Sequence, residues 1–231
     1  IDAKGVVTKA HTPGFYTTGD NNWFYADSHG RNVTGAQIIN GQHLYFDANG
    51  RQVKGGFVMN TDGSRSFYHW NTGDKLVSTF FTTGHDRWYY ADDKGNVVTG
   101  AQVINGQKLF FATDGKQVKG DFATNANGSR SYYHGATGNK LVSTFFTTGD
   151  NNWYYADAKG ELVVGEQTIN GQNLYFDQTG KQVKGTTAAN PDGSISYYDV
   201  HTGEKAINRW VKIPSGQWVY FNAQGKGYVS N

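Results

Sequence analysis

The chain alternates short aromatic and apolar runs with turns rich in Asp and Gly, and this pattern recurs along its length. The stretch that begins at Trp88 reads W-Y-Y-A-D-D-K-G-N-V-V-T-G-A-Q, and similar stretches begin at Trp23, Trp153 and Trp218. Successive members of this set of tryptophans stand 65 residues apart. Repetition at a fixed period predicts a repeat architecture, in which each unit buries its apolar face against its neighbours.

A shorter period lies inside the long one. In the first 65-residue unit the same design starts at Trp23, Leu44 and Phe67. The corresponding starts in the next two units are Trp88, Leu109 and Tyr132, and Trp153, Leu174 and Tyr197. Each start has a short aromatic strand, a turn with Gly and a second short strand, which is typical of a β-hairpin. Because a lone hairpin is marginally stable in water, we predict an all-β β-solenoid of stacked β-hairpins, with about three hairpins per 65-residue turn.

The repeats define the expected domain organisation. We predict one repeat domain over residues 1–231. Its units lie at about 23–87, 88–152 and 153–217, with partial modules at 1–22 and 218–231. A β-propeller with unequal blades is the alternative, although a blade needs about four strands and roughly 40 residues. No window has a sustained apolar period of 3.6 residues, so we expect almost no helix. The chain opens in the middle of a module, which indicates a fragment whose signal and any catalytic part lie upstream.

Composition narrows the class of protein. Apolar residues make up 37% of the 231 residues, aromatic residues 15%, and there are 31 glycines. That many aromatic residues excludes disorder, and the absence of cysteine excludes disulfides and cysteine-ligated metals. The net charge of +2 comes from interspersed residues with no basic stripe, which argues against a nucleic-acid partner. No run of about 20 apolar residues predicts a membrane span, and we expect a monomer.

Strand alternation predicts which side chains face the core. Leu44 and Phe46 are apolar in every copy, so they are predicted to be core residues. By the same register Trp23 and Tyr25 are expected to face inward, and the residue between each such pair outward. The outward aromatic residues are then Phe24, Tyr89 and Tyr154 in the first module, and Tyr45, Phe110 and Tyr175 in the second.

The segment after the second-module turn carries the candidate binding groups. It reads Gln52-Val53-Lys54, and alternation predicts that Gln and Lys point outward on the face of the Tyr45 ring. The equivalent pairs are Gln117 with Lys119, and Gln182 with Lys184. An aromatic ring with an amide and an ammonium group suits a sugar, whose C–H face packs on the ring while its hydroxyls form hydrogen bonds. The alternative is that Gln and Lys only solubilise an exposed strand, where Lys protects the sheet edge.

No catalytic constellation is present in the sequence. Glycoside hydrolysis needs two carboxylates across the scissile bond, but the recurring aspartates lie in turns, where Asp accepts hydrogen bonds from nearby backbone. These aspartates are Asp27, Asp47, Asp92, Asp114, Asp157 and Asp177. No nucleophilic triad, phosphate loop or nucleotide fingerprint occurs. We expect no cofactor, no metal and no catalysis by this chain.

The modules W-Y-Y-A-D-x-K-G and L-Y-F-D-x-x-G-x-Q-V-K-G resemble the glucan-binding and cell-wall-binding repeats of bacterial glucansucrases. The resemblance covers essentially the whole chain and is closest to domain V of dextransucrase-like enzymes. It implies a secreted, non-catalytic domain with pockets between hairpins that bind α-1,6-linked glucan (dextran, isomaltooligosaccharides) for an upstream catalytic domain. The residues it implies are Gln52, Lys54, Gln117, Lys119, Gln182 and Lys184, with Tyr45, Tyr89, Tyr154 and Tyr175 as stacking platforms. Phe110 and Phe24 lack the hydroxyl of their counterparts.

Two other functions stay open at this point. The related choline-binding repeats form an aromatic cage for a quaternary ammonium and usually carry Gly-Trp after the second strand. Here those positions read Gly35-Ala36, Gly55-Gly56 and Gly100-Ala101, so one wall of such a cage is missing. A structural stalk without a ligand is the third possibility.

Overall fold

We describe a computed structural model of the chain for residues 11–19, 22–149 and 152–229. These residues contain strands and turns and no helix, so none of them forms a helix that could cross a membrane. The opening residues 1–10, which the sequence places in the middle of a module, lie outside the described residues. Contacts divide the chain into two structural units, and from here on the word unit refers to these. The first unit is residues 1–102 and 110–117, and the second is residues 103–109 and 118–231. The three 65-residue sequence repeats are called copies.

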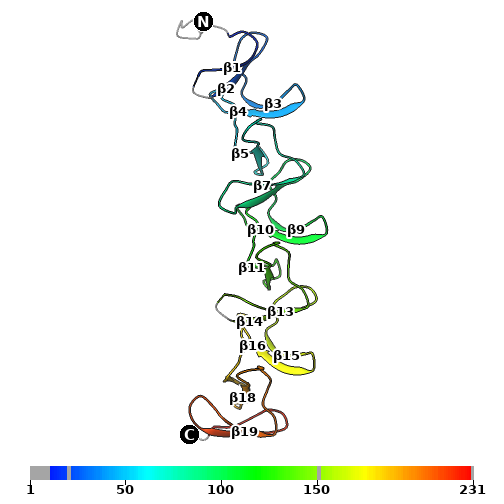
Figure 1. Ribbon diagram of the computed structural model, residues 1–231, viewed down its shortest axis with the longest axis vertical. Helices are drawn as coiled ribbons and strands as arrows, with labels where there is room; N and C mark the ends of the chain where they lie inside the picture. The colour runs from blue at the N-terminus through cyan, green and yellow to red at the C-terminus, as the bar shows by residue number, and fades with distance from the viewer. Residues whose placement is uncertain (1–10, 20–21, 150–151, 230–231) are drawn as a thin grey trace. The chain divides into compact units, whose positions relative to one another are not determined.

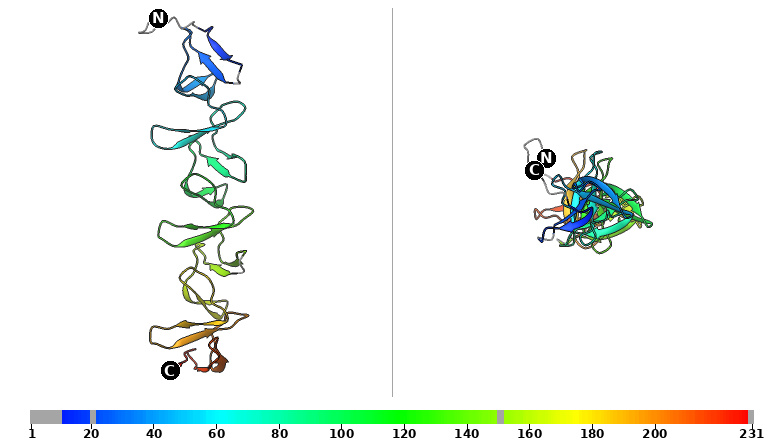
Figure 2. Two further views of the ribbon diagram at one scale, coloured as in Figure 1. Left: turned by 90° about the vertical axis from the view of Figure 1, so that its left-hand side faces the viewer. Right: turned by 90° about the horizontal axis from the view of Figure 1, so that it is seen from above.

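Consecutive strands pair in ten two-stranded sheets within the described residues (Figure 1). The first unit contains β1 (Gly14–Thr17), β2 (Trp23–Ala26), β3 (Gly35–Ile39), β4 (Gln42–Phe46), β5 (Gly56–Met59), β6 (Arg65–Tyr68), β7 (Thr79–Thr82) and β8 (Trp88–Ala91). Next come β9 (Gly100–Ile104) and β10 (Gln107–Phe111). The second unit continues with β11 (Asp121–Thr124), β12 (Arg130–Tyr133), β13 (Thr144–Thr147), β14 (Trp153–Ala156), β15 (Gly165–Ile169), β16 (Gln172–Phe176), β17 (Thr186–Ala189), β18 (Ile195–Tyr198), β19 (Arg209–Lys212) and β20 (Trp218–Phe221). Figure 2 shows the hairpins of each unit projecting to different sides from one to the next.

The pairing of the strands differs from the prediction in one respect. The aromatic strand was expected to open each hairpin, but it is the second strand and pairs with the strand before it, as Thr79–Thr82 of β7 pairs with β8. The segment after the Asp turn pairs with the aromatic strand through one residue only, as Gln52 does with Phe46. It forms no second strand because its backbone then binds other hairpins.

This bridging segment connects three successive hairpins through its backbone. The N–H of Gln52 donates to the carbonyl of Trp23 in β2 at 2.7 Å, and the N–H of Val53 to Tyr45 in β4 at 2.8 Å. Two residues on, the N–H of Gly55 donates to Tyr68 in β6 at 2.9 Å. Since the partners lie on three hairpins, the strict two-residue alternation of a strand does not apply here. The same three bonds recur in the second unit at Gln182, Val183 and Gly185.

The core is a series of small clusters between neighbouring hairpins. Leu44 and Phe46 are 1% and 0% exposed, which confirms them as core residues, and Tyr25 packs against them with part of its surface exposed. Their counterparts Leu109, Phe111, Leu174 and Phe176 are equally buried. Another cluster of the first unit joins Phe67, Phe81 and Tyr89. Burial of aromatic rings therefore supplies much of the apolar contact that a thick aliphatic core would otherwise provide.

The predicted orientation of the first-module aromatic residues was wrong. Tyr89 and Tyr154 were expected to face outward, yet they are 6% and 7% exposed, whereas Trp88 and Trp153 are 36% and 38% exposed. Tyr89 lies opposite Phe81 in the middle of its hairpin, and the two rings stack at 5.3 Å. The tryptophan lies one residue nearer the Thr-Thr-Gly loop, at the end of the hairpin that solvent reaches.

The turns follow the predicted chemistry. The Oδ1 atom of Asp47 accepts hydrogen bonds from the N–H groups of Asn49 and Arg51, each at 2.9 Å. The same atom of Asp27, Asp92, Asp114, Asp157 and Asp177 also accepts from backbone N–H groups of its own turn. The N–H group of Arg31 is the main cause that lowers the pKa of Asp27 below its ordinary value. These carboxylates therefore hold turns, as the sequence predicts.

Candidate functional site

A hollow of about 420 Å³ lies in the first unit, between two indole rings. We call it the indole hollow. It is lined by Asn22, Trp23, Asp47, Arg51, Gln52, Val53, Lys54 and Trp70. Trp23 comes from β2, Trp70 follows β6, and the residues between them in space come from the turn and bridging segment after β4. Three successive hairpins thus contribute to one hollow, because the bridging segment joins all three.

The polar groups of the indole hollow are oriented by bonds to one another and to the backbone. Nε2 of Gln52 donates to the carbonyl oxygen of Thr72 at 3.2 Å. The Arg51 guanidinium forms an ion pair with Asp47, with Nε 3.4 Å from Oδ2. Nζ of Lys54 lies 5.2 Å from the centroid of the Trp23 ring, within the range of a cation–π interaction. The hollow thus combines apolar ring surface with fixed donors and acceptors.

The structure corrects the predicted position of the glutamines. Gln52, Gln117 and Gln182 were expected to point outward, but they are 7%, 6% and 6% exposed. The reason is the bridging backbone, which places the side chain of Gln52 beneath the next turn against Gly73. Lys54, Lys119 and Lys184 are half-buried. The glutamine therefore joins neighbouring hairpins, and only part of it is available to a ligand.

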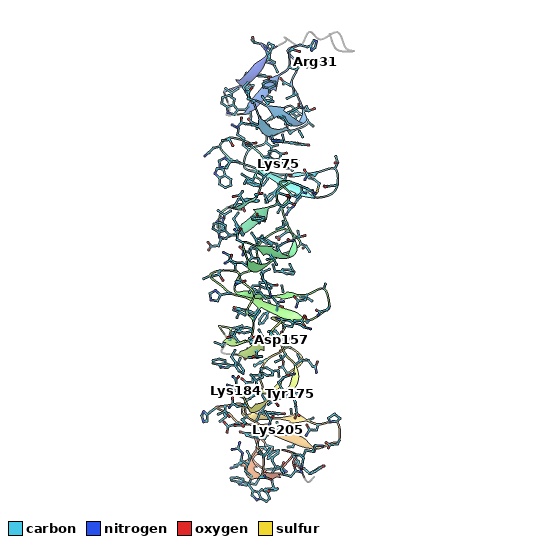
Figure 3. All side chains as sticks on the ribbon, turned by 90° about the vertical axis from the view of Figure 1, so that its right-hand side faces the viewer. Arg31, Lys75, Asp157, Tyr175, Lys184 and Lys205 are labelled. Carbon is cyan, nitrogen blue, oxygen red and sulfur yellow. The ribbon has the colours of Figure 1, made fainter. Side chains whose placement is uncertain are left out.

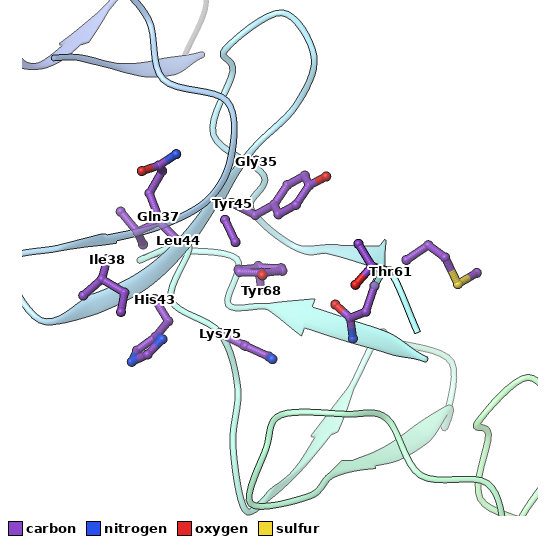
Figure 4. Close-up of a pocket in the computed structure, with 12 residues that line it drawn as sticks. Gly35, Gln37, Ile38, His43, Leu44, Tyr45, Thr61, Tyr68 and Lys75 are labelled. Carbon is purple, nitrogen blue, oxygen red and sulfur yellow. The ribbon is translucent and has the colours of Figure 1, made fainter. Parts of the chain in front are cut away.

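Tyr45 lines a different hollow, which we call the tyrosine hollow. Its volume is about 550 Å³, and Figure 4 shows Tyr45, Tyr68 and Lys75 among the side chains around it. The Tyr45 and Tyr68 rings lie 5.9 Å apart with their planes at 48°. Burial raises the pKa of Tyr68 above its ordinary value, and Tyr45 adds to the effect. The expected single patch of Tyr45, Gln52 and Lys54 is therefore two hollows.

The third copy repeats the indole hollow in part. Nζ of Lys184 lies 5.2 Å from the centroid of the Trp153 ring and 3.4 Å from the carbonyl oxygen of His201. Nε2 of Gln182 donates to the carbonyl oxygen of Thr202 at 3.4 Å. Figure 3 shows Lys184 and Tyr175 in the same part of the second unit. The copies differ at the second wall, because Trp70 is replaced by Gly135 in the second copy and by Val200 in the third.

The other predicted site residues are placed as follows. Tyr175 is half-buried and its ring lies 5.5 Å from that of Tyr198, so it has the surroundings of Tyr45. Phe110 is half-buried too. Gln117 is buried in the first unit, and Lys119 is half-buried in the second. Tyr89 and Tyr154 are buried and offer no ring face to a ligand.

Sequence reasoning missed the two indoles. Trp23 was expected to be a core residue, but it is half-buried and lines the hollow. Trp70 was not singled out, although it is 45% exposed. Its signal in the sequence is a break in the repeat, because a large aromatic residue stands where the other copies carry Gly and Val. Among the described residues, no group of three or more His, Cys, Asp or Glu side chains could hold a metal ion.

Comparison with family models shows the family to which the chain belongs. A model described as a choline-binding repeat matches residues 33–80, 98–145 and 163–210, more than half of the chain. The chain belongs to the choline-binding repeat family. A second model of this kind, described as a cell wall binding repeat, matches residues 78–97, 143–162 and 208–226. The chain is thus built from binding repeats.

Relatives of this choline-binding repeat chain include streptococcal glucosyltransferases. It is 39% identical over 206 residues to Glucosyltransferase-S of Streptococcus mutans, covering 89% of this chain and 14% of that protein. It is 45% identical over 190 residues to Glucosyltransferase-I of the same species, covering 82% of this chain and 13% of that protein. The predicted resemblance to glucansucrases is confirmed. The chain spans a small part of these relatives.

Solved structures show the fold of the family. Choline binding protein F of Streptococcus pneumoniae has a TM-score of 0.65 and 19% identity, covering 90% of this chain and 76% of that one. The choline-binding domain of CbpL from the same species has a TM-score of 0.61 and 20% identity, covering 86% and 99%. At these identities the likeness concerns the fold alone, and it confirms an all-β solenoid of stacked hairpins.

Proposed function

We propose that this chain is a non-catalytic carbohydrate-binding region that holds α-1,6-linked glucan, such as dextran and isomaltooligosaccharides. The parent protein is a glucansucrase that acts outside the cell, and the repeats keep its glucan near the catalytic domain. The observation that carries the proposal is the indole hollow, where Trp23 and Trp70 flank amide, carboxylate, guanidinium and ammonium groups. Rings supply surface for the C–H face of a pyranose, and the polar groups bond its hydroxyls.

The same hollow argues against choline as the ligand. A choline site needs a bare aromatic face for its quaternary ammonium. Here the ammonium group of Lys54 already lies over the Trp23 ring, and that of Lys184 over the Trp153 ring. A second cation at those faces would meet a like charge. The lysine instead offers hydrogen-bond donors to sugar hydroxyls. Choline binding remains the alternative that the family description favours, and the test below separates the two.

Calorimetric titration with isomaltotriose, dextran and choline tests the proposal, with Trp70→Val as the main variant. Valine occupies the equivalent position of the third copy, so the fold accepts it there. We expect Trp70→Val to weaken isomaltotriose binding at the first copy about tenfold, which corresponds to about 1.4 kcal/mol. Lys54→Met should have a similar effect because a donor to the sugar is lost. Choline should not bind the native chain.

Trp210→Ala serves as the matched control. Trp210 is 63% exposed, lies in β19 of the second unit and is not among the residues that line the indole hollow. It should leave isomaltotriose binding unchanged. Binding of choline in place of isomaltotriose would reject the glucan assignment. Equal loss in Trp70→Val and Trp210→Ala would show that the hollow is not the site.

A further inference from the structure

The third copy contains an ion-paired cluster at the position that corresponds to the tyrosine hollow, and its glutamate and lysine line a hollow of about 480 Å³. Glu166 lies in β15, directly opposite Tyr175 in β16. Its Oε1 atom is 2.5 Å from Nζ of Lys205 and accepts a hydrogen bond from the hydroxyl of Tyr198 at 3.1 Å. The Lys205 side chain is only 12% exposed. We call Glu166, Tyr198 and Lys205 the third-copy latch, and Figure 3 labels Lys205 beside Tyr175.

The backbone that holds this cluster is the same in the first copy. Tyr68 and Lys75 form the isolated bridge that Tyr198 and Lys205 form in the third copy. The N–H of Lys75 donates to the carbonyl of His43 at 2.9 Å, and the N–H of Lys205 donates to Asn173 at 2.8 Å. The two tyrosine pairs also match, with ring centroids 5.9 Å and 5.5 Å apart.

Only the carboxylate is missing from the first copy. Ala36 stands where the third copy has Glu166, opposite Tyr45 in the strand pair β3–β4. Within the described part of the chain, no ion pair or hydrogen bond involves Nζ of Lys75 or the hydroxyl of Tyr68. Nearby carboxylates have other donors: Oδ1 of Asp74 accepts from the N–H of His43 at 2.8 Å.

Asp62 is the other acidic group within electrostatic range of Lys75. Its Oδ1 atom accepts hydrogen bonds from the backbone N–H and the hydroxyl of Ser64, at 2.9 Å and 2.6 Å. Asp62 is thus held in its own turn and does not replace Glu166. An ammonium and a phenol hydroxyl therefore line a 550 Å³ hollow without the acceptor that the third copy supplies.

We propose that the tyrosine hollow of the first copy binds an oxyanion carried on a saccharide, held by Nζ of Lys75 and the hydroxyl of Tyr68. The oxyanion is a carboxylate or a phosphate, and it occupies the place of the Glu166 carboxylate in the third copy. Charge-assisted hydrogen bonds of this kind are the strong ones. The ring of Tyr45 forms the wall for the sugar, and a hollow of this size lies in the range of small-molecule sites. In the third copy the carboxylate of Glu166 already bonds to the equivalent ammonium and hydroxyl.

Titration followed by NMR of ring-labelled tyrosines tests this site, with D-glucuronate, glucose 6-phosphate and glucose as probes. We expect the signals of Tyr45 and Tyr68 to shift with one or both anions and much less with glucose. The two anions distinguish a carboxylate site from a phosphate site. Lys75→Met should weaken the binding at least tenfold. No shift with either anion at roughly 20 mM, where a site with a dissociation constant of about 1 mM is nearly saturated, would overturn the proposal.

Two reciprocal substitutions test the site with residues that the fold already carries at the same position of another copy. Ala36→Glu should abolish anion binding at the first copy, and the position accepts glutamate because the third copy already carries it. Glu166→Ala should create anion-dependent shifts of Tyr175 and Tyr198. Ala48→Glu, in an exposed turn of the first unit, is the charge-matched control and should keep the binding. Anion binding that survives Ala36→Glu, or that Ala48→Glu removes equally, would refute the assignment.

Discussion

Replacement of Gly73 by alanine tests the coupling between hairpin stacking and the indole hollow. Gly73 is buried in the turn after β6 and has a φ of +72°. A Cβ atom there would overlap Nε2 of Gln52 and would lie 2.9 Å from its Cδ atom. The glutamine would have to move, and with it the bond to Thr72 and the neighbouring stem of Lys54. Gly63 is the matched control, because its φ is +83° and a Cβ atom there meets nothing within 4 Å.

Both substitutions carry the same backbone cost, but only Gly73→Ala also breaks a side-chain hydrogen bond. Each places an L-residue in the left-handed region, which costs about 1–2 kcal/mol. Gly73→Ala also displaces Gln52, so a hydrogen bond worth about 1 kcal/mol is lost. We therefore expect Gly73→Ala to destabilise its hairpin by about 2–3 kcal/mol and Gly63→Ala by about 1–2 kcal/mol. Only Gly73→Ala should also weaken isomaltotriose binding, because Gln52 and Lys54 line the hollow.

Hydrogen exchange of the Gln52 backbone amide measures the local effect, since this N–H bonds to Trp23 of the preceding hairpin. An extra cost of about 1 kcal/mol appears as a roughly fivefold faster exchange in Gly73→Ala than in Gly63→Ala. In a Gln52→Ala background the clash is absent, so a double-mutant cycle should give a coupling of about 1 kcal/mol between positions 52 and 73. Equal effects at both glycines, or no coupling, would refute the argument that Gln52 is packed beneath Gly73.

Three further expectations concern the ligand sites and the latch. Val200→Trp should build the second indole wall of the third copy and raise its affinity for isomaltotriose about tenfold in calorimetry; an unchanged affinity would count against Trp70 as a wall. The hydrogen bond from Lys205 lowers the pKa of Glu166 below its ordinary value, so the latch contributes stability above that ordinary value and loses it as pH falls through the folded pKa. Carboxyl ¹³C titration should locate that midpoint, and one at or above the ordinary value would contradict the latch. High-mass dextran should be retained on an affinity gel far more strongly than isomaltotriose binds, because linking weak sites raises the apparent affinity by roughly 10² to 10⁴; equal binding per chain would reject multivalency.

The sequence by itself determined the repeat, the all-β class, the core and the turns. Leu44 and Phe46 are core residues because residues two apart share one face of a strand. Asp47 holds its turn because a short carboxylate reaches backbone N–H groups only two and four residues on. These features depend on contacts within a few residues, and each copy repeats them. Resemblance to glucansucrase repeats then supplied the expected class of ligand.

Only the tertiary structure decided which side chains form the sites. Strand alternation placed Gln52 outward, but its segment binds the backbones of three hairpins and turns the side chain inward. Tyr45 and Lys54 are nine positions apart in the sequence, yet they line separate hollows. The indole hollow takes Trp23 and Trp70 from hairpins on either side of that segment. Such contacts depend on how one hairpin stacks on the next, which hydrogen bonds between backbones fix and which a residue's own strand pattern does not contain.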